Sequence, residues 1–277
     1  MDNKEVRRTV RNGYARVARG GGSCCGDSAC CGAPDAGKTS RAVGYTDEDL
    51  AAVPAGANLG LGCGNPVALA ALRPGDTVLD LGSGAGFDCF LAAKQVGPGG
   101  RVIGVDMTPE MVEKARDNAR RAGTANVEFR LGEIEHLPVA DASADAVISN
   151  CVINLSPDKP QAFREAFRAL RPEGRLMVSD IVLAAPLPRQ LLESAAAYVG
   201  CISGASLRDE YLGMIAEAGF REVTVVAEER YPVELGATDP TLRAIASESG
   251  LSTGELQAAA AGITSIKVAA VKPVPVA

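Results

Sequence analysis

Between residues 74 and 181, short runs of branched apolar residues alternate with segments whose apolar residues recur at helical spacing. Strands are predicted over residues 77–81, 101–106, 127–131, 144–149 and 175–181, and helices over residues 87–96, 109–122 and about 159–170. Right-handed crossovers through the helices make successive strands of one sheet parallel. The pattern therefore predicts an α/β fold with a Rossmann-like, doubly wound and mostly parallel sheet.

The flanking segments follow a different rhythm. A helix over about residues 3–18 leads into a loop over residues 20–40 that is rich in Gly, Ser, Cys and Ala. Beyond residue 185 we expect helices at about 188–199 and 207–218, a strand at 222–227, a helix from Pro240 capped by Asp239, and an antiparallel last strand at 265–271. We therefore predict an N-terminal helix with a cysteine-rich loop (1–60), a cofactor-binding core (61–185) and a C-terminal region (186–277) that completes the sheet and the thiol site.

Composition excludes several function classes. Net charge is −6 and the basic residues are scattered, so nucleic acid is not an expected partner, and the Arg-containing opening predicts a solvated helix face. The chain has no apolar run of bilayer length and no secretory signal at its start, so we expect no membrane association and a cytoplasmic location. One histidine and no tryptophan exclude a histidine-based triad and a zinc site with several imidazoles.

A glycine-rich motif, Asp80-Leu81-Gly82-Ser83-Gly84-Ala85-Gly86, falls between the first predicted strand and its helix. Glycines allow a tight turn and a close approach of a ligand to the backbone at the carboxyl end of the sheet. A dinucleotide fingerprint needs a glycine where Phe87 stands, so this spacing suits a cofactor without a pyrophosphate. The alternative is an ordinary strand-to-helix turn with an acidic residue by chance.

Two later turns favour the cofactor interpretation. Asp106 ends the second strand, where a carboxylate can accept hydrogen bonds from both hydroxyls of a ribose. Residues 132–135 follow the third strand, where an adenine would lie in an open α/β crevice. The motif, the acid and the third turn occur in the order that a nucleoside cofactor requires.

Cysteines are the second chemical feature, and they stand at positions 24, 25, 30, 31, 63, 89, 151 and 201. In a reducing compartment this number favours soft-metal binding or redox chemistry over a disulfide network. Cys63 lies in a glycine-rich turn, Cys151 directly follows the fourth strand, and Cys201 follows the first appended helix. We expect Cys89, within a core helix, to be a buried apolar side chain.

Thiolates select soft, thiophilic acceptors over ions that prefer oxygen. Three thiolates form a pyramidal cage for As(III), whose lone pair stays free to attack a methyl sulfonium. Such a reaction needs no general base on the arsenic, in agreement with the single histidine. Its catalysis would come mainly from holding the lone pair in line with the methyl–sulfur bond.

Residues 74–181 resemble the class I S-adenosylmethionine-dependent methyltransferases. The resemblance implies that the methionine portion is held by Asp80, Gly82, Ser83, Gly84 and Gly86, the ribose by Asp106, and the adenine by Met107 with Glu133 or Ile134 near its edge.

The cysteine-bearing segments are more specific. Tyr14 with residues 23–26, and residues 62–66, 149–155 and 201–205, look like the arsenite S-adenosylmethionine methyltransferases. This resemblance implies that Cys63, Cys151 and Cys201 bind trivalent arsenic, that arsenite and methylarsenite are substrates, and that an external thiol reductant of the glutathione or thioredoxin type resets the enzyme. The family's further N-terminal cysteine has four candidates, Cys24, Cys25, Cys30 and Cys31, which would capture arsenic or relay thiols; the alternative is a four-cysteine zinc or soft-metal site.

Two other functions remain open from the sequence. One is a small-molecule C- or O-methyltransferase of the same fold with incidental cysteines. The other is a non-catalytic arsenic or metal sensor, against which the intact glycine motif and Asp106 weigh, because a sensor has no use for a methyl donor.

Overall fold

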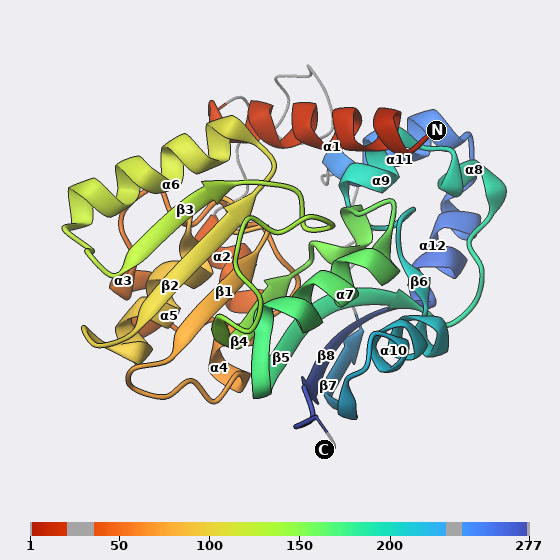
Figure 1. The fold of residues 1–277 in the computed structure, drawn as a ribbon. Helices are drawn as coiled ribbons and strands as arrows, with labels where there is room; N and C mark the ends of the chain where they lie inside the picture. The colour runs from red at the N-terminus through yellow and green to blue at the C-terminus, as the bar shows by residue number, and fades with distance from the viewer. Residues whose placement is uncertain (1, 21–35, 231–239, 276–277) are drawn as a thin grey trace.

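The computed structural model describes residues 2–20, 36–230 and 240–275, and this part of the chain is built around one mixed β-sheet (Figure 1). The strand order is β3-β2-β1-β4-β5-β8-β7, and the short β6 pairs with β5 away from this path. The strands are β1 (Thr77–Leu81), β2 (Arg101–Asp106), β3 (Val127–Leu131), β4 (Ala144–Asn150), β5 (Leu170–Leu183), β6 (Ser206–Leu207), β7 (Arg221–Arg230) and β8 (Ile263–Val271).

Strand direction and order create a crevice at one edge of the sheet. β1 to β5 run parallel to one another, whereas β8 runs antiparallel to both β5 and β7. The order reverses between β1 and β4, and ligands of open α/β sheets bind outside the carboxyl ends of the strands at such a switch point. The predicted doubly wound sheet with an antiparallel strand near the C-terminus is confirmed. β5 is longer than predicted at both ends: it begins at Leu170, which pairs with Ala144 of β4, and it ends at Leu183, which pairs with Ile263 of β8.

The helices follow the prediction in the core and also at residues 3–18, at about 207–218 and from Pro240, and they differ from it elsewhere. They are α1 (Asn3–Ala18), α2 (Ala36–Ala42), α3 (Asp47–Ala52), α4 (Pro66–Leu69), α5 (Phe87–Val96), α6 (Pro109–Ala122), α7 (Lys159–Ala169), α8 (Arg189–Leu192), α9 (Ala195–Val199), α10 (Arg208–Glu217), α11 (Pro240–Ser249) and α12 (Thr253–Ala261). The loop predicted over residues 20–40 was given a C-terminal end that is too late in the chain, because α2 already begins at Ala36. The single helix predicted over 188–199 is two helices, because the Ser194 hydroxyl accepts a hydrogen bond from the Ala197 N–H and starts α9. The predicted Asp239 cap lies outside the described residues.

Helices cover both faces of the sheet, and side chains alternate between two apolar cores. On one face Leu79 and Val147 pack with residues of α7 and α10, including the fully buried Phe163 and Tyr211. On the other face, the neighbouring strand residues pack with α4, α5 and α6. Strands from both sides of residue 185 share this sheet, so the sheet itself does not mark the domain boundary predicted there. That boundary remains a prediction.

A third apolar cluster lies at the carboxyl end of the parallel strands. It combines Val10 of α1 with residues of β5, α8, α9 and β8, and it contains Cys63, Cys151 and Cys201. α1 crosses above this end of the sheet in Figure 1. A capping box between Asp2 and Glu5 begins α1 and satisfies backbone donors at its first turn.

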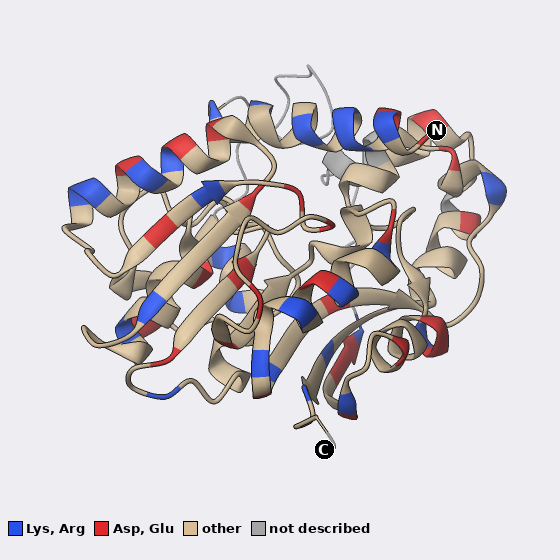
Figure 2. Cartoon of the chain, viewed as in Figure 1, with Lys and Arg blue, Asp and Glu red and all other residues tan. Residues whose placement is uncertain are grey.

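Charged residues recur along α1 and α6, as the blue and red segments of these helices in Figure 2 show. On α1, Lys4, Arg8, Arg11 and Arg16 are exposed while Val6 and Val10 are buried, which is the solvated helix face that the sequence predicted. Within the described part of the chain, no helix is both long and apolar enough to cross a membrane.

Candidate functional site

A pocket opens at the carboxyl ends of β1, β2 and β4, beneath α1. Its walls come from α1, the loop before α4, the β1–α5 turn, the residues after β2 and β3, and the segment that follows β4. The contributing side chains include Tyr14, Leu61, Asp80, Asp106 and Cys151. The pocket therefore lies at the topological switch point and reaches one of the three buried cysteines of interest.

The glycine-rich turn forms the floor of the pocket at Gly82, Ser83 and Gly84. Gly82 and Gly84 have φ angles of 67° and 51°, which disfavour residues with a β-carbon. A Cβ on Gly82 would lie 2.4 Å from Val152, whereas a Cβ on Gly84 would meet nothing within 4 Å. The turn thus leaves open space at Gly84, which a bound cofactor can fill.

Gly86 has a different place from the one its motif predicted. It is not in the pocket wall; it precedes α5 with a φ of 95°, and a Cβ there would lie 2.8 Å from both Phe90 and Phe129. Its role in this structure is to let α5 pack closely on the core.

Asp106 and Met107 line the pocket as the sequence predicted. The Asp106 Oδ2 atom accepts the Gly84 N–H at 2.9 Å, and its Oδ1 accepts the Thr108 N–H at 2.8 Å. Each oxygen keeps capacity for one further hydrogen bond, which suits a ribose diol. Burial raises the pKa of Asp106, while the two backbone N–H groups act against that rise. The buried Ser83 hydroxyl, also in the wall, has no hydrogen-bond partner among the described residues.

Behind the glycine turn lies a polar cluster that the sequence analysis missed. Cys89, expected only as an apolar filler, donates its thiol to Asp80 Oδ2 at 3.1 Å. Asp88 lines the pocket and accepts the Tyr45 hydroxyl at 2.6 Å. Burial, followed by the Asp88 charge, raises the pKa of Asp80 well above its ordinary value. Burial also raises the pKa of Asp88 to about 6. The carboxylate within the first turn of a predicted helix was the available signal for Asp88.

The turn after β3 brings Ile134 and Glu135, but not Glu133, into the pocket wall. Glu133 instead forms an ion pair with Arg7 of α1 at 3.3 Å, and Glu135 accepts the Ser156 hydroxyl at 2.7 Å. Of the two predicted adenine neighbours, Ile134 therefore has the suitable position.

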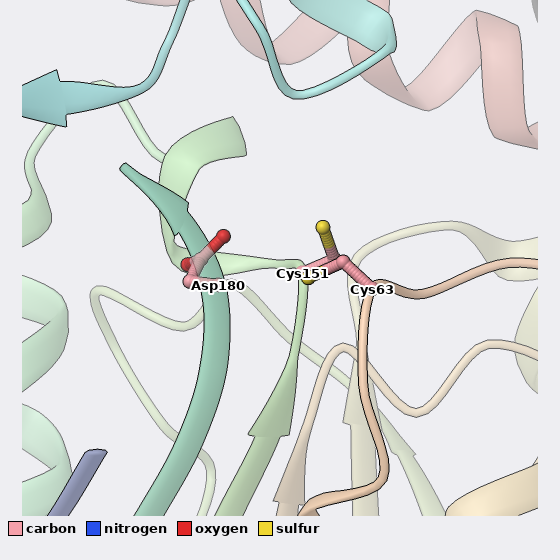
Figure 3. A group of neighbouring side chains, drawn as sticks. All are labelled: Cys63, Cys151 and Asp180. Atoms are coloured by element: carbon pink, nitrogen blue, oxygen red, sulfur yellow. The ribbon is translucent and has the colours of Figure 1, made fainter. Parts of the chain in front are cut away.

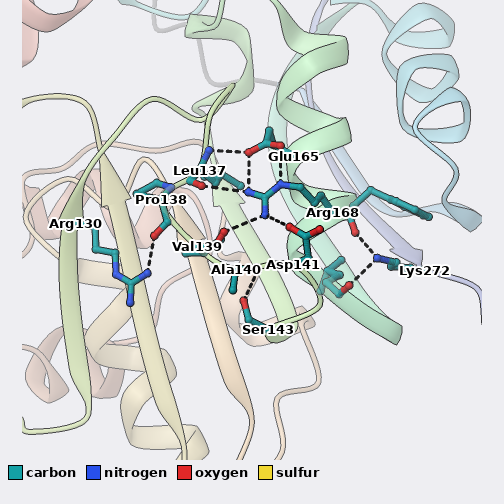
Figure 4. Close-up of polar contacts among 12 residues, drawn as sticks. Arg130, Leu137, Pro138, Val139, Ala140, Asp141, Ser143, Glu165, Arg168 and Lys272 are labelled. Carbon is teal, nitrogen blue, oxygen red and sulfur yellow. Dashed lines mark hydrogen bonds and ion pairs between the residues drawn. The ribbon is translucent and has the colours of Figure 1, made fainter.

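Arg168 of α7 fixes the chain that leaves this turn, as Figure 4 shows. Its guanidinium donates to the carbonyls of Leu137 and Val139 at 3.1 and 2.9 Å and to the Asp141 carboxylate at 2.6 Å. Glu165 completes the contact by accepting the Leu137 N–H at 2.8 Å. These bonds tie residues 137–141 to α7, directly after the pocket residues Ile134 and Glu135 in the chain.

Three free thiols, from segments far apart in the sequence, lie together beside the pocket. Cys151 ends β4 with a φ of 59° and donates its N–H to the Ser179 carbonyl at 2.7 Å. The Cys201 thiol donates to the Cys151 carbonyl at 3.1 Å, and the Cys63 Sγ lies 3.6 Å from the Ser179 carbonyl oxygen. All three cysteines are buried, and none forms a disulfide.

The thiols also influence one another. Hydrogen bonds with the Cys201 and Cys63 thiols, together with burial, raise the pKa of Cys151 well above its ordinary value. Burial raises the pKa of Cys63. Cys63 and Cys151 are therefore protonated near neutral pH, and protonated thiols react slowly with oxidants.

Asp180 of β5 is the acidic neighbour of these thiols (Figure 3). One ligand atom from each of Cys63, Cys151 and Asp180 lies within 4.8 Å of the other two. The carboxylate accepts Asn154 Nδ2 at 2.8 Å and the Tyr211 hydroxyl at 3.0 Å, and burial raises its pKa to about 7. The sequence analysis missed Asp180, although a carboxylate inside an apolar strand was a usable signal.

The N-terminal candidates Cys24, Cys25, Cys30 and Cys31 lie outside the described residues, so their prediction stays as it was.

Comparisons with known proteins agree with this geometry. The sequence pattern of the methyltransferase domain family matches residues 72–219. The chain is 52% identical over 236 residues to the arsenite methyltransferase of Halobacterium salinarum, covering 82% of this chain and 60% of that protein. It is 42% identical over 175 residues to the arsenite methyltransferase of Aquipseudomonas alcaligenes, covering 61% of this chain and 50% of that protein. The chain thus spans less than two thirds of the length of these curated relatives.

A solved structure extends the likeness to three dimensions. The arsenic(III) S-adenosylmethionine methyltransferase from Chlamydomonas reinhardtii matches with a TM-score of 0.61 and 32% identity. The match covers 87% of this chain and 74% of that one.

Proposed function

Since this chain belongs to the arsenite methyltransferases, within the methyltransferase domain family, we propose that it transfers methyl groups from S-adenosylmethionine to trivalent arsenic held by its own thiols. The observation that carries the proposal is the double position of Cys151, which lines the pocket and shares a buried cluster with Cys63 and Cys201. A donor site and an acceptor site meet at this residue.

On the donor side, Asp106 would bind the ribose, and Met107 and Ile134 would flank the adenine. The methionine portion would lie over Gly82, Ser83 and Gly84, close to Asp80. S-adenosylmethionine supplies an activated methyl group on a sulfonium. The open space at Gly84 and the unpartnered Ser83 hydroxyl support this fit.

On the acceptor side, Cys63, Cys151 and Cys201 would replace the three hydroxyl groups of arsenite. Each exchange forms one As–S bond, breaks one As–O bond, and joins the thiol proton with the departing hydroxide as water. Protonated resting thiols are therefore no obstacle to binding. Asp180, beside two of the thiols, would pass these protons because its pKa of about 7 allows both protonation states near neutral pH.

The arsenic lone pair would carry out the methyl transfer once the three thiolates hold the arsenic. The sulfur ligands leave the arsenic lone pair free, and the cage would hold it in line with the methyl–sulfur bond. The lone pair would form the arsenic–carbon bond while the methyl–sulfur bond breaks, and the electrons of that bond would leave on the sulfur of S-adenosylhomocysteine, so arsenic would be formally oxidised by two electrons. Two electrons must return before another methylation. We propose that an external thiol reductant, of the glutathione or thioredoxin type, supplies them.

The site also suggests where the protein works. Four buried cysteines of the described chain are free thiols, a state that a reducing compartment preserves. We propose the cytoplasm as that compartment, and Cys24, Cys25, Cys30 and Cys31 as an entry point that captures arsenic or relays thiols.

One assay tests the proposal directly. The protein is incubated with methyl-labelled S-adenosylmethionine, arsenite and a thiol, and methylated arsenic is separated and counted. We expect label in arsenic species only when all components are present. Cys89→Ser is the control for loss of a buried thiol outside the acceptor cluster, and its hydroxyl can still donate to Asp80 as the thiol does, so label should still reach arsenic. Label in a carbon or oxygen acceptor, unaffected by removal of Cys63, would instead support a small-molecule methyltransferase. Arsenite binding without turnover would support a sensor.

A further inference from the structure

The loop that carries Cys63 is wedged between two strand ends, and its neighbouring glycines show how tightly. A Cβ on Gly62 would lie 2.7 Å from the Asn150 amide nitrogen, and Gly62 has a φ of 101°. A Cβ on Gly64 would lie 2.0 Å from the Ser179 hydroxyl. Real Cβ atoms do not approach other atoms this closely, so both contacts require glycine. The loop backbone therefore packs directly against the Asn150 side chain.

The Asn150 amide also forms the hydrogen bonds that hold this loop. Its Oδ1 accepts the Cys63 N–H at 3.0 Å, and its Nδ2 donates to the Gly64 carbonyl at 2.8 Å. On its other side, Nδ2 lies 2.8 Å from the Tyr45 hydroxyl and 3.1 Å from Asp88 Oδ2. One side chain thus binds the backbone on either side of the Cys63 thiol. It is itself oriented by Asp88, which lines the pocket, and by Tyr45, whose hydroxyl donates to Asp88.

The other two thiols do not depend on this amide. Cys151 is held through its own N–H, which donates to the Ser179 carbonyl, and Cys201 through its thiol, which donates to the Cys151 carbonyl. Asn150 precedes Cys151 in the chain, but its side chain bonds in the opposite direction, toward residues 62–64. The hydrogen bonds therefore divide the three thiols into a pair and a single thiol. The pair, Cys151 and Cys201, is held without the Asn150 amide, whereas Cys63 is held by that amide and by the Ser265 hydroxyl, which donates to the Cys63 carbonyl at 2.7 Å.

We propose that Asn150 is a positioning residue that keeps Cys63 within reach of the arsenic and thereby determines whether the site accepts three-coordinate inorganic arsenite. The inference rests on the proposed function. Inorganic arsenite offers three oxygens for exchange, whereas monomethylarsenite offers two. Loss of the Asn150 amide therefore impairs the first substrate, which needs Cys63, more than the second, which needs only the pair.

The test compares the two substrates at saturating S-adenosylmethionine, so that changes in cofactor affinity do not enter. Asn150→Ala removes both hydrogen bonds from the amide to the loop. The ratio of the arsenite rate to the monomethylarsenite rate should fall by about tenfold or more. Asn126→Ala is the matched control, because its amide donates to Ala93 and Gly97 carbonyls away from the pocket, and its ratio should stay at the wild-type value.

Two further variants separate the loop from the amide without removing Asn150. Gly62→Ala introduces the clashing Cβ, and Tyr45→Phe removes one hydroxyl that orients the amide while leaving the ring against Phe87. Both should lower the same ratio, the second by less, even where Asn150→Ala fails to fold. Equal loss on both substrates in the folded variants would overturn the inference. If the wild-type protein does not methylate arsenite, the proposed function itself is wrong, and the inference about Asn150 has no basis.

Discussion

The two halves of the candidate site are built in different ways. The donor half is assembled mainly from the β1–α5 turn and the end of β2, and its ordering hydrogen bonds come from backbone groups such as the Gly84 N–H. The acceptor half joins Cys63, Cys151 and Cys201 inside an apolar cluster. The first is a local, partly open backbone structure, whereas the second exists only when the tertiary fold is complete. Variants should therefore affect the two halves separately.

The largest effect is expected at the thiols that both substrates would share. Cys151→Ser and Cys201→Ser should reduce methylation of arsenite and of monomethylarsenite to background, because a serine hydroxyl is a hard and poorly ionised ligand. Affinity for S-adenosylmethionine should remain close to wild type. Product analysis with both arsenicals, beside cofactor titration, measures this. Retained turnover of either arsenical by Cys151→Ser would show that Cys151 is not a required arsenic ligand, and the acceptor half would then be wrongly assigned.

Cys63→Ser should produce a partial defect. It should lose inorganic arsenite as a substrate but keep much of the activity on monomethylarsenite, which has only two positions left to exchange. The same product analysis measures both activities. If this variant methylates inorganic arsenite at the wild-type rate, the three-thiolate cage is wrong.

On the donor half, Asp106→Ala should weaken S-adenosylmethionine binding by roughly 1.5–3 kcal/mol for each hydrogen bond to the charged group that is lost. Arsenite binding should change little. Calorimetric titration with each ligand checks both statements, and Asp106→Asn, which keeps one acceptor oxygen, should lose less. Undiminished cofactor affinity in the alanine variant would remove the ribose assignment.

The last effect concerns the pH dependence of stability rather than the chemistry of either half. Burial raises the pKa of Asp180 to about 7, against an ordinary value of 3.8, so between these values the folded protein keeps a proton that the unfolded chain has released. The free energy of unfolding should therefore fall as pH rises from about 4 to 7, by at most about 1.4 kcal/mol per pH unit from this group.

Asp180→Asn isolates that contribution, because an asparagine oxygen can still accept from Asn154 and the Ile181 N–H. Urea unfolding at several pH values should give a flatter pH dependence for the variant, most clearly above pH 6, where Asp88 with its pKa of about 6 no longer contributes. Parallel curves for variant and wild type would show that Asp180 titrates normally.

The difference between the halves also explains what the sequence predicted well. The bounds of β1, α5 and β2 and the pocket positions of Gly82 and Asp106 follow from local spacing, so they were predicted without a structure. Gly86 and Glu133 were misplaced because a motif does not reveal which of its members pack inward. The meeting of Cys63 with Cys201 could not be derived from spacing at all, since it depends on β4, β5 and the turn after α9 together, and only the family resemblance suggested it. Asp180 was missed because an acidic residue in an apolar strand acquires its meaning from partners elsewhere in the chain.

The left-handed backbone at Cys151 and Cys201 has an evolutionary consequence. A residue with a β-carbon costs roughly 1–2 kcal/mol in this conformation, which offsets much of what a buried side chain contributes by packing. Folding alone therefore gives little reason to keep either cysteine, and glycine would relieve the backbone at both positions. A descendant released from its need for these thiols should drift to glycine here first, so the identity of these two positions is a record of selection for chemistry rather than for stability.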